Sequence, residues 1–266
     1  MVMNEKTGLS KGVKKAIIGA IIAVVVIGLG VGAFMVWKSG IFDTKMKLTI
    51  AEGTVNLEDS KGNITSAKSN MDFKSGDTIS TSYDGTACVT IDNTKKVWVE
   101  GYSRVEFDKK GTNIEVYVNK GGLFFEVSDH LGEDEKYRIK TDDLTVNLTR
   151  GTSGYISYDP TGLEYIVLTD GMATITAKNP VTGQSKSAEI RGGQKIDVYL
   201  YSQKSTSRDS VEFITGNVRP KTLPEFVLRV IAKNPALLTN ICQYNSWDES
   251  EMQYYIDHLP GMNKEE

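Results

Sequence analysis

The stretch "FKSGDTISTSYDGTACVTIDNTKKVWVEGYSRVEF", residues Phe73–Phe107, decides the fold class of this chain of 266 residues. Apolar side chains recur at every second position, most clearly in "TACVTI", residues Thr86–Ile91. This alternation is typical of a β-strand with one face on a hydrophobic core. The breaks contain Gly76-Asp77 and Asp84-Gly85, in which glycine supplies a positive φ and aspartate satisfies the local backbone. The stretch therefore predicts β-strands joined by tight turns, and it contains no obvious catalytic group.

The same period of two continues along the chain from Leu48 to Leu200. Short runs such as "IEVYV" at Ile114–Val118 and "ATITA" at Ala173–Ala177 are separated by further glycine turns. Many short strands at this spacing predict an all-β sandwich, roll or short solenoid. No residue-level repeat indicates a propeller or a leucine-rich array.

The order of these strands and turns resembles the FecR-type domain of bacterial envelope proteins. The opening stretch resembles the family's Gly-Asp turn and strand series, and "VYVNKGGLFFEV" resembles its strand–glycine–strand step. "YRIKTDDLTVNLTRGTSGYISY", "YIVLTDGMATITA" and "EIRGGQKIDV" continue the series, so that the resemblance covers Leu48–Val198. The residues that carry it are turn residues with a structural role: Gly76, Asp77, Gly121, Gly151, Thr152, Gly171 and Gly193.

This chain departs from the family pattern in two places. After Gly151-Thr152 the family has a large apolar residue, whereas Gly154 stands here before Tyr155, which puts the local strand register in question. Family members that restrain sigma factors carry a helical cytoplasmic domain before a membrane span. Here only the segment 1–15 precedes the apolar run described next, and so short a segment cannot bury a core. Direct binding of a sigma factor is therefore not inferred from the resemblance.

The run "AIIGAIIAVVVIGLGVGAFMVW", Ala16–Trp37, carries no charge and is long enough to cross a bilayer as a helix. A cleaved signal peptide is the alternative, but its apolar core is shorter and ends at a small-residue site, whereas this run ends in "FMVWK". Lysines concentrate before the run, which predicts a cytoplasmic N-terminus. We therefore predict a basic cytoplasmic tail at 1–15 and a signal-anchor helix at 16–37. The expected location is the bacterial cytoplasmic membrane, single-pass, with the C-terminal domain extracytoplasmic.

The remaining segments follow from changes in composition and period. They are a juxtamembrane linker at 38–47, the FecR-like β-domain at 48–200, a polar linker at 201–219, C-terminal helices at 220–260 and a tail at 261–266. Three helix starts are predicted in the C-terminal part, at Thr222-x-x-Glu225, at Asn234-Pro235 and at Ser246-x-x-Glu249. Helices this short are marginal alone and need a surface on which to pack.

Charge and cysteine content exclude some partners. The formal net charge is −3, and the basic tail holds four of the lysines, so the rest of the chain is more acidic still. A basic footprint for nucleic acid is absent. The two cysteines, Cys88 and Cys242, have no metal-binding spacing, and their positions on a strand face and in a helical segment favour two separate thiols over a disulfide.

Catalytic and metal-binding motifs are not recognisable. His130 lies near Asp129, Glu133 and Asp134, but the order of residues does not match a calcium loop, and a solvated acidic loop is the preferred interpretation. His258 falls near the end of the last predicted helix, where a cation suits the helix dipole. No G-x-S-x-G sequence is present. We therefore predict no catalytic, cofactor or metal site and no enzymatic activity, although chance pairs of carboxylates leave a hydrolase open.

One set of aromatic residues is a candidate binding surface. If the strands alternate regularly, its members all occupy the face opposite the main apolar set: Trp98, Tyr117, Phe124, Tyr199 and Tyr201. An exposed patch of this kind would indicate a site for a protein or a saccharide. The alternative is that a further layer, such as the C-terminal helices, covers this face.

The sequence thus predicts a membrane-anchored, extracytoplasmic FecR-domain protein that binds or senses without catalysis. Its expected partner is another protein or a cell-wall polymer, with no nucleic acid. One alternative is a transmembrane signalling regulator that acts through a separate membrane partner, and a second is an envelope polysaccharide hydrolase.

Overall fold

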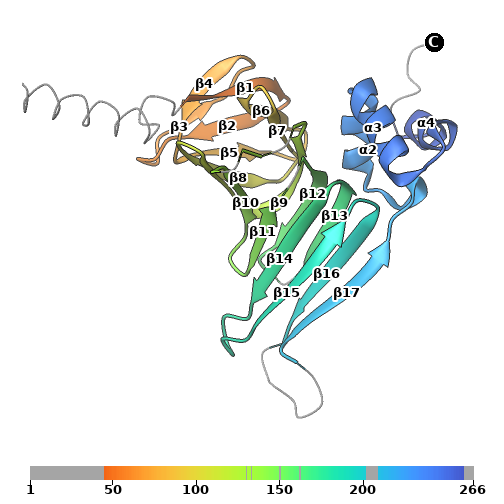
Figure 1. The fold of residues 1–266 in the computed structure, drawn as a ribbon. Helices are drawn as coiled ribbons and strands as arrows, with labels where there is room; N and C mark the ends of the chain where they lie inside the picture. The colour runs from red at the N-terminus through yellow and green to blue at the C-terminus, as the bar shows by residue number, and fades with distance from the viewer. Residues whose placement is uncertain are drawn as a thin grey trace, which may run out of the picture. The chain divides into compact units, whose positions relative to one another are not determined.

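The computed structural model describes six segments of the chain, all within one compact unit, Thr44–Glu266 (Figure 1). They are residues 45–129, 131–132, 134–149, 151–161, 163–201 and 209–260. The predicted cytoplasmic tail at 1–15, the predicted span at 16–37 and the tail at 261–266 lie outside them, as does most of the linker at 38–47.

The structure corrects the membrane part of the predicted fold class and the predicted localisation. None of the helices in the described segments is long and apolar enough to cross a bilayer. The single-pass helix, the membrane as a partner and the location in the cytoplasmic membrane therefore have no support and are not carried further. The mainly β body followed by a small helical appendage agrees with the prediction.

Strands occupy most of the described residues. They are β1 (Lys45–Glu52), β2 (Val55–Glu58), β3 (Ile64–Ser66), β4 (Met71–Lys74), β5 (Asp77–Thr81), β6 (Thr86–Asp92), β7 (Lys95–Val99), β8 (Arg104–Lys110), β9 (Asn113–Val127), β10 (Lys136–Lys140), β11 (Leu144–Leu148), β12 (Ser153–Asp159), β13 (Leu163–Asp170), β14 (Met172–Lys178), β15 (Ser185–Arg191), β16 (Gln194–Leu200) and β17 (Val211–Asn217). The last strand lies inside the segment 201–219 that was expected to be a linker.

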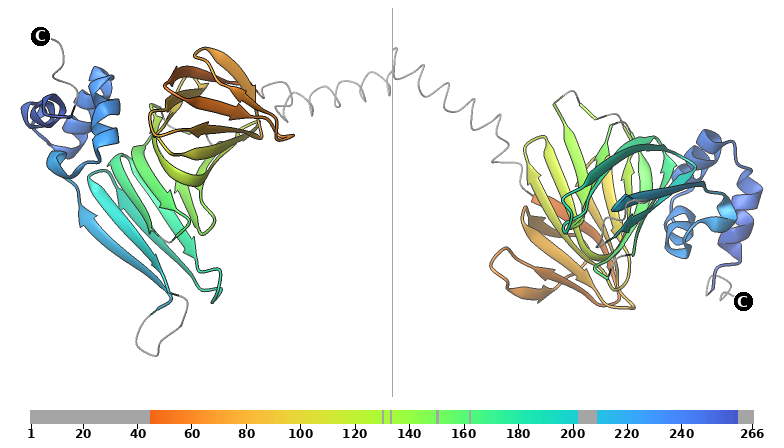
Figure 2. Two further views of the ribbon diagram at one scale, coloured as in Figure 1. Left: turned by 180° about the vertical axis from the view of Figure 1, so that it is seen from behind. Right: turned by 90° about the horizontal axis from the view of Figure 1, so that it is seen from below.

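The strands form two layers that share one strand. Sheet A has the order β4-β1-β6-β7-β9-β12-β13-β16-β17, and sheet B has the order β3-β2-β5-β8-β9-β10-β11-β14-β15. All pairs are antiparallel except β9 with β10. Figure 2 shows the two layers from behind and from below.

Strand β9 passes from one sheet to the other at its two central glycines. Residues 113–120 pair with β8 in sheet B, whereas residues 121–126 pair with β12 in sheet A. Gly121 has φ +88°, and a Cβ there would lie 2.2 Å from Ser103 Oγ. The N–H of Gly122 donates to Ser103 Oγ at 2.9 Å. The bend therefore depends on a glycine both for its dihedral angle and for its close contact.

The inward faces of both sheets form the main core. Fully buried side chains at alternate positions include Ile79, Val89, Val105, Phe107, Val116, Leu123, Phe125, Val146, Ile166 and Ile196. The period of two that is visible in the sequence is therefore the period of core contacts, as expected for a sheet with one buried face.

The other turn residues that carry the resemblance to the FecR-type domain lie at turns or at the ends of strands. Gly76, Gly171 and Gly193 have positive φ, whereas Gly151 does not. Asp77 Oδ2 accepts a hydrogen bond from the N–H of Lys74 at 2.8 Å, and Thr152 is buried.

The departure at Gly154 coincides with a register irregularity. The pairing of β12 with β13 shifts between Ser153 and Gly154. A Cβ on Gly154 would lie 2.5 Å from the carbonyl oxygen of Val167 and 2.9 Å from the ring of Phe125. The space of a side chain is occupied here by the neighbouring strands, which explains why the large apolar residue is missing.

Three α-helices follow the strands within the described residues: α2 (Glu225–Ala232), α3 (Pro235–Asn245) and α4 (Glu249–Asp257), preceded by the 3₁₀ turn η1 (Pro220–Thr222). The predicted start at Asn234-Pro235 is correct, with Pro235 at the first helical position. The other two starts are displaced. Pro224 precedes α2, while Thr222 Oγ1 accepts from the N–H of Arg219 in the 3₁₀ turn.

At α4 the capping residue is Asp248, whose side chain accepts from the N–H of Ser250 at 2.8 Å. Ser246, the predicted cap, instead ends α3 in the left-handed conformation. The carboxylate of Asp248 satisfies the kind of backbone donor that the predicted cap would have satisfied, so the error is one of position.

We expect Gly121→Ala to destabilise the protein more than Gly62→Ala, measured as the free energy of unfolding in urea. Gly62 has a similar φ of +84°, but no atom lies within 4 Å of the place that a Cβ would take. Its substitution therefore reports the dihedral cost alone, about 1 kcal/mol. At Gly121 the contact with Ser103 adds an overpacking cost of about 1–3 kcal/mol. Equal effects of the two substitutions would contradict the role given to the bend.

A second prediction concerns Glu164 on β13, which is 7% exposed and accepts a hydrogen bond from Thr141 Oγ1 at 2.7 Å. Burial raises the pKa of this carboxyl from 4.5 to about 7. The native state then holds a proton that the unfolded state has released, so the free energy of unfolding falls as the pH rises through this window.

Glu164→Gln keeps an acceptor for Thr141 and removes the titration. Urea unfolding should show a gain of up to about 3 kcal/mol at about pH 8 and little change at about pH 4. The matched control is Glu189→Gln on the exposed strand β15. A gain for Glu164→Gln that is the same at both pH values would refute this account.

Candidate functional site: a groove between α2 and sheet A

The outward face of sheet A carries a row of apolar side chains, one from each of five strands. Cys88, Trp98, Phe124, Tyr155 and Val167 are successive register partners on β6, β7, β9, β12 and β13. Trp98 and Phe124 are in ring contact, with centroids 5.8 Å apart. We call this set the outer row.

The C-terminal helices cover the outer row and form a second core with it. Phe226, Val227 and Ile231 of α2 belong to the same buried cluster, as do residues of α3 and α4. The ring of Phe226 lies 6.2 Å from that of Tyr155. The helices therefore dock on the face that is turned away from the main core.

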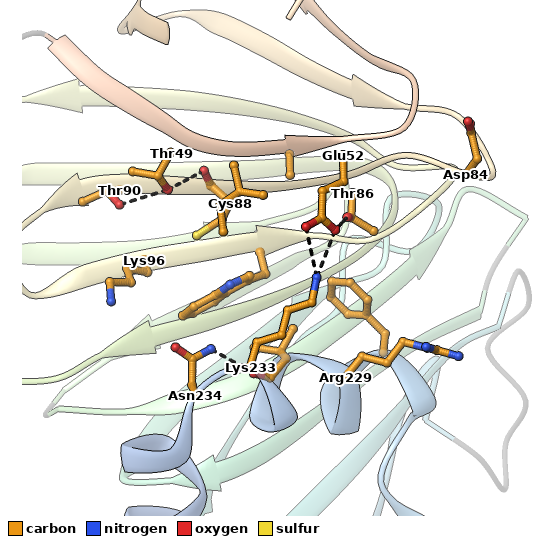
Figure 3. A pocket seen from close by; sticks show the side chains of 15 residues that line it. Thr49, Glu52, Asp84, Thr86, Cys88, Thr90, Lys96, Arg229, Lys233 and Asn234 are labelled. Atoms are coloured by element: carbon orange, nitrogen blue, oxygen red, sulfur yellow. Dashed lines mark hydrogen bonds and ion pairs between the residues drawn. The ribbon is translucent and has the colours of Figure 1, made fainter. Parts of the chain in front are cut away.

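The cover is incomplete over β1, β6 and β7, where a groove of about 530 Å³ remains (Figure 3). Its floor consists of outward side chains of the three strands: Thr49, Ile50, Thr86, Cys88, Thr90 and Trp98. Its wall is formed by Phe226, Arg229 and Val230 of α2 and by Lys233, which directly follows the helix. A volume of this size suits a few side chains of a ligand.

An ion pair bridges the groove at one end. Lys233 Nζ lies 2.9 Å from Glu52 Oε2 on β1, and the same carboxylate accepts from Thr86 Oγ1 at 3.3 Å (Figure 3). Arg229 is held within the helical unit, since it pairs with Glu225 at 2.6 Å and donates to the carbonyl of Pro260. At the other end Lys96 lines the groove and forms no side-chain hydrogen bond or ion pair with the described residues, and its register partner on β9 is Glu126.

Both cysteines are free thiols in the second core. Cys88 is in the groove floor, and Thr49 Oγ1 donates to its backbone carbonyl at 3.0 Å. Burial raises the pKa of the Cys88 thiol, and it raises the pKa of Cys242 in α3 to about 11. Thiols with a raised pKa are poor nucleophiles, so Cys88 contributes apolar contact rather than reactivity.

The structure separates the five candidate aromatic residues. Trp98 and Phe124, 8% and 0% exposed, lie together beneath the helices. Tyr199, 36% exposed, and Tyr201 lie on β16 and just after it, and Tyr201 donates to Glu212 Oε2 at 2.9 Å. Tyr117 is on the other sheet, where its hydroxyl donates to Asp142. No single aromatic patch is formed by these five residues.

Of the two histidines, the structure describes only His258. His130 and Glu133 lie outside the described residues. His258 follows α4, with Nδ1 2.7 Å from the carbonyl oxygen of Tyr254. No group of His, Cys, Asp and Glu in the described segments is arranged to hold a metal ion.

Sequence reasoning missed the groove itself. Its floor comes from outward positions of β1 and of the opening stretch. The C-terminal helices were named as a possible cover of this face, but not the part of it that they leave open. The prediction that the short helices need a surface on which to pack indicated that a docking face exists, but not where on the sheet it lies.

Comparisons with known proteins leave the family open. No family model matches this chain, and no curated protein matches it. Two solved structures that match are crystal structures from Parabacteroides distasonis, both provisionally described as anti-sigma factors.

Both structures are only distantly similar to this chain. The first has 15% identity and a TM-score of 0.44, over 57% of this chain and 64% of its own. The second has 15% identity and a TM-score of 0.45, over 63% and 74%. The chain therefore spans less than two thirds of the first structure, and similarity at this level supports no inference about function.

The bridging ion pair should contribute little to stability. Both side chains are more than half exposed, and exposed pairs contribute below about 1 kcal/mol. A double-mutant cycle of Glu52→Gln and Lys233→Met, followed by urea unfolding, should give a coupling energy in that range that declines with added salt. A coupling that is larger and independent of salt would show that the pair anchors α2.

Proposed function

We propose that this protein is a non-catalytic binding module with a regulatory or sensing role, and that it takes a segment of a partner protein into the groove between α2 and sheet A. The observation that carries the proposal is the groove itself: an apolar floor and wall open to solvent, with charged side chains at its rim. This combination of an apolar centre and a polar rim is typical of protein recognition sites.

The groove favours a polypeptide over a wall polymer. Saccharide sites usually offer an exposed aromatic face on which a sugar ring can stack. Trp98, the indole of the floor, is almost completely buried, and the exposed part of the groove combines Ile50 and threonine hydroxyls with the charged side chains of the rim. Apolar side chains of a peptide fit these surroundings better than a hydroxylated chain does.

The resemblance to the FecR-type domain is consistent with this proposal, because it implies a binding or signalling role without catalysis. We propose membership of that class for the β-domain alone. Sigma-factor binding is not part of the proposal, since no feature of the groove specifies such a partner. That the protein is not an enzyme stays a prediction.

A photo-crosslinking amino acid placed at Ile50 tests the proposal in cells that produce the protein. Ile50 is 38% exposed in the groove, and Ile64 on β3, 65% exposed, is the matched control position in sheet B. We expect a protein adduct from position 50 that is missing from position 64 and is reduced by Thr90→Trp, which fills the groove.

The identity of the adduct decides whether the groove binds a protein or a cell-wall polymer. Wall fragments at position 50 would favour polymer binding, and equal labelling at both positions would contradict a role for the groove. The adducted peptide, once sequenced, can be synthesised and its affinity for the purified protein measured with and without Thr90→Trp.

A further inference from the structure

A second pocket, of about 560 Å³, lies beside the groove on the other side of the α2–α3 corner. Its lining includes Glu126, Ser153 and Asp170 from sheet A, together with Leu237, Asn240 and Tyr244 from α3. The hydroxyl of Tyr244 donates to the carbonyl of Gly171 at 3.2 Å, which holds α3 against the turn after β13. The pocket is therefore built by the same docking of helices on sheet A as the groove.

One row of side chains connects the two cavities. Thr90, Lys96, Glu126, Ser153 and Asp170 are successive register partners across β6, β7, β9, β12 and β13. The first two line the groove, and the other three line the second pocket. On the helical side Asn234 lines the groove and Leu237, one turn later, lines the pocket. The groove and the second pocket therefore lie next to each other along this row of side chains, which we call the path.

The two cavities differ in chemistry. The groove is mainly apolar, whereas the lining of the second pocket includes three acidic residues, Glu126, Asp129 and Asp170. Burial raises the pKa of both Glu126 and Asp170. Arg191 at the pocket is turned to Glu189, at 3.2 Å. Neither Glu126 nor Asp170 has an ion pair within the described part of the chain. Lys96, the register partner of Glu126, opposes the rise in the pKa of that carboxyl. The three acidic residues that line the second pocket outnumber its basic lining residue, Arg191, so this half of the path is complementary to a cation.

We propose that the groove and the second pocket form one extended site for a polypeptide segment that places apolar side chains in the groove and a lysine or arginine side chain among the carboxylates of Glu126 and Asp170. This inference rests on the proposed function and adds the chemistry of the partner. Neighbouring strands of a sheet are about 4.8 Å apart. β7, which carries Lys96 in the groove, and β12, which carries Ser153 in the second pocket, are separated by β9 and are therefore about 10 Å apart. An extended segment covers this distance in about three residues.

Selection from a library of random peptides displayed on phage, with the full chain as bait, tests the proposal. We expect enriched sequences in which apolar residues are followed, about three positions further, by lysine or arginine. Ile50→Lys, which blocks the groove, should abolish enrichment, whereas Ile64→Lys should not.

An enriched peptide is then synthesised, and its affinity is measured by fluorescence polarisation. Glu126→Gln combined with Asp170→Asn should weaken its binding about tenfold, as should exchange of its basic residue for glutamine, because each change removes charge-assisted hydrogen bonds. Asp72→Asn, a charge removal at an exposed position of β4 that lines neither cavity, should leave the affinity unchanged. Circular dichroism melting of each variant verifies that it is folded.

The outcomes separate this inference from the proposed function. Two outcomes would overturn the extended site and leave the groove as a binding site. In the first, the enriched peptides are lost with Ile50→Lys but contain no basic residue. In the second, they bind equally well to the Glu126→Gln, Asp170→Asn double variant. If the selection enriches no peptide whose binding is lost with Ile50→Lys, both the extended site and the proposed function are overturned. Binding of the chain to a second copy of itself, detected by light scattering and abolished by Ile50→Lys, would likewise replace the peptide ligand.

Discussion

The packing of the C-terminal helices on the outer row of sheet A is the interaction on which the rest of the molecule depends. Helices of eight, eleven and nine residues are too short to be stable alone. The outer row, with Trp98 and Phe124 at its centre, would be an exposed apolar patch without them. Each part supplies the apolar surface that the other lacks, and a second core results on the side of the sheet that is turned away from the first.

Both cavities are consequences of that packing. Sheet A is wider than the helical unit, so its outward face continues beyond α2 towards β1 and beyond α3 towards the turn after β13. The residues at these borders combine side chains from neighbouring strands of the sheet with side chains from one helix. Along the proposed site, the strand register places three charged residues in order: Lys96, then Glu126, then Asp170.

The glycines of the family-like turns also have a role in this arrangement. A Cβ on Gly192 would lie 2.4 Å from the ring of Tyr244, and the N–H of Gly193 donates to the carbonyl of Leu168. The "RGG" turn therefore serves as part of the docking surface for α3, in addition to joining β15 to β16. A motif that looks like a simple turn in the sequence is, in the folded protein, a place where a helix comes close to the backbone.

The sequence by itself determined the period of the strands, the turns between them and the existence and order of the short helices. These are local properties, since each depends on residues within a few positions of one another. Only the tertiary structure decided which sheet each strand joins. Tyr117 and Phe124 lie on one strand, yet the bend at Gly121 places them on different sheets, because alternation specifies a side of a strand and not its neighbours. The groove, the second pocket and the row that links them likewise depend on register between distant strands and on where the helices dock, and neither is encoded within any single stretch of the chain.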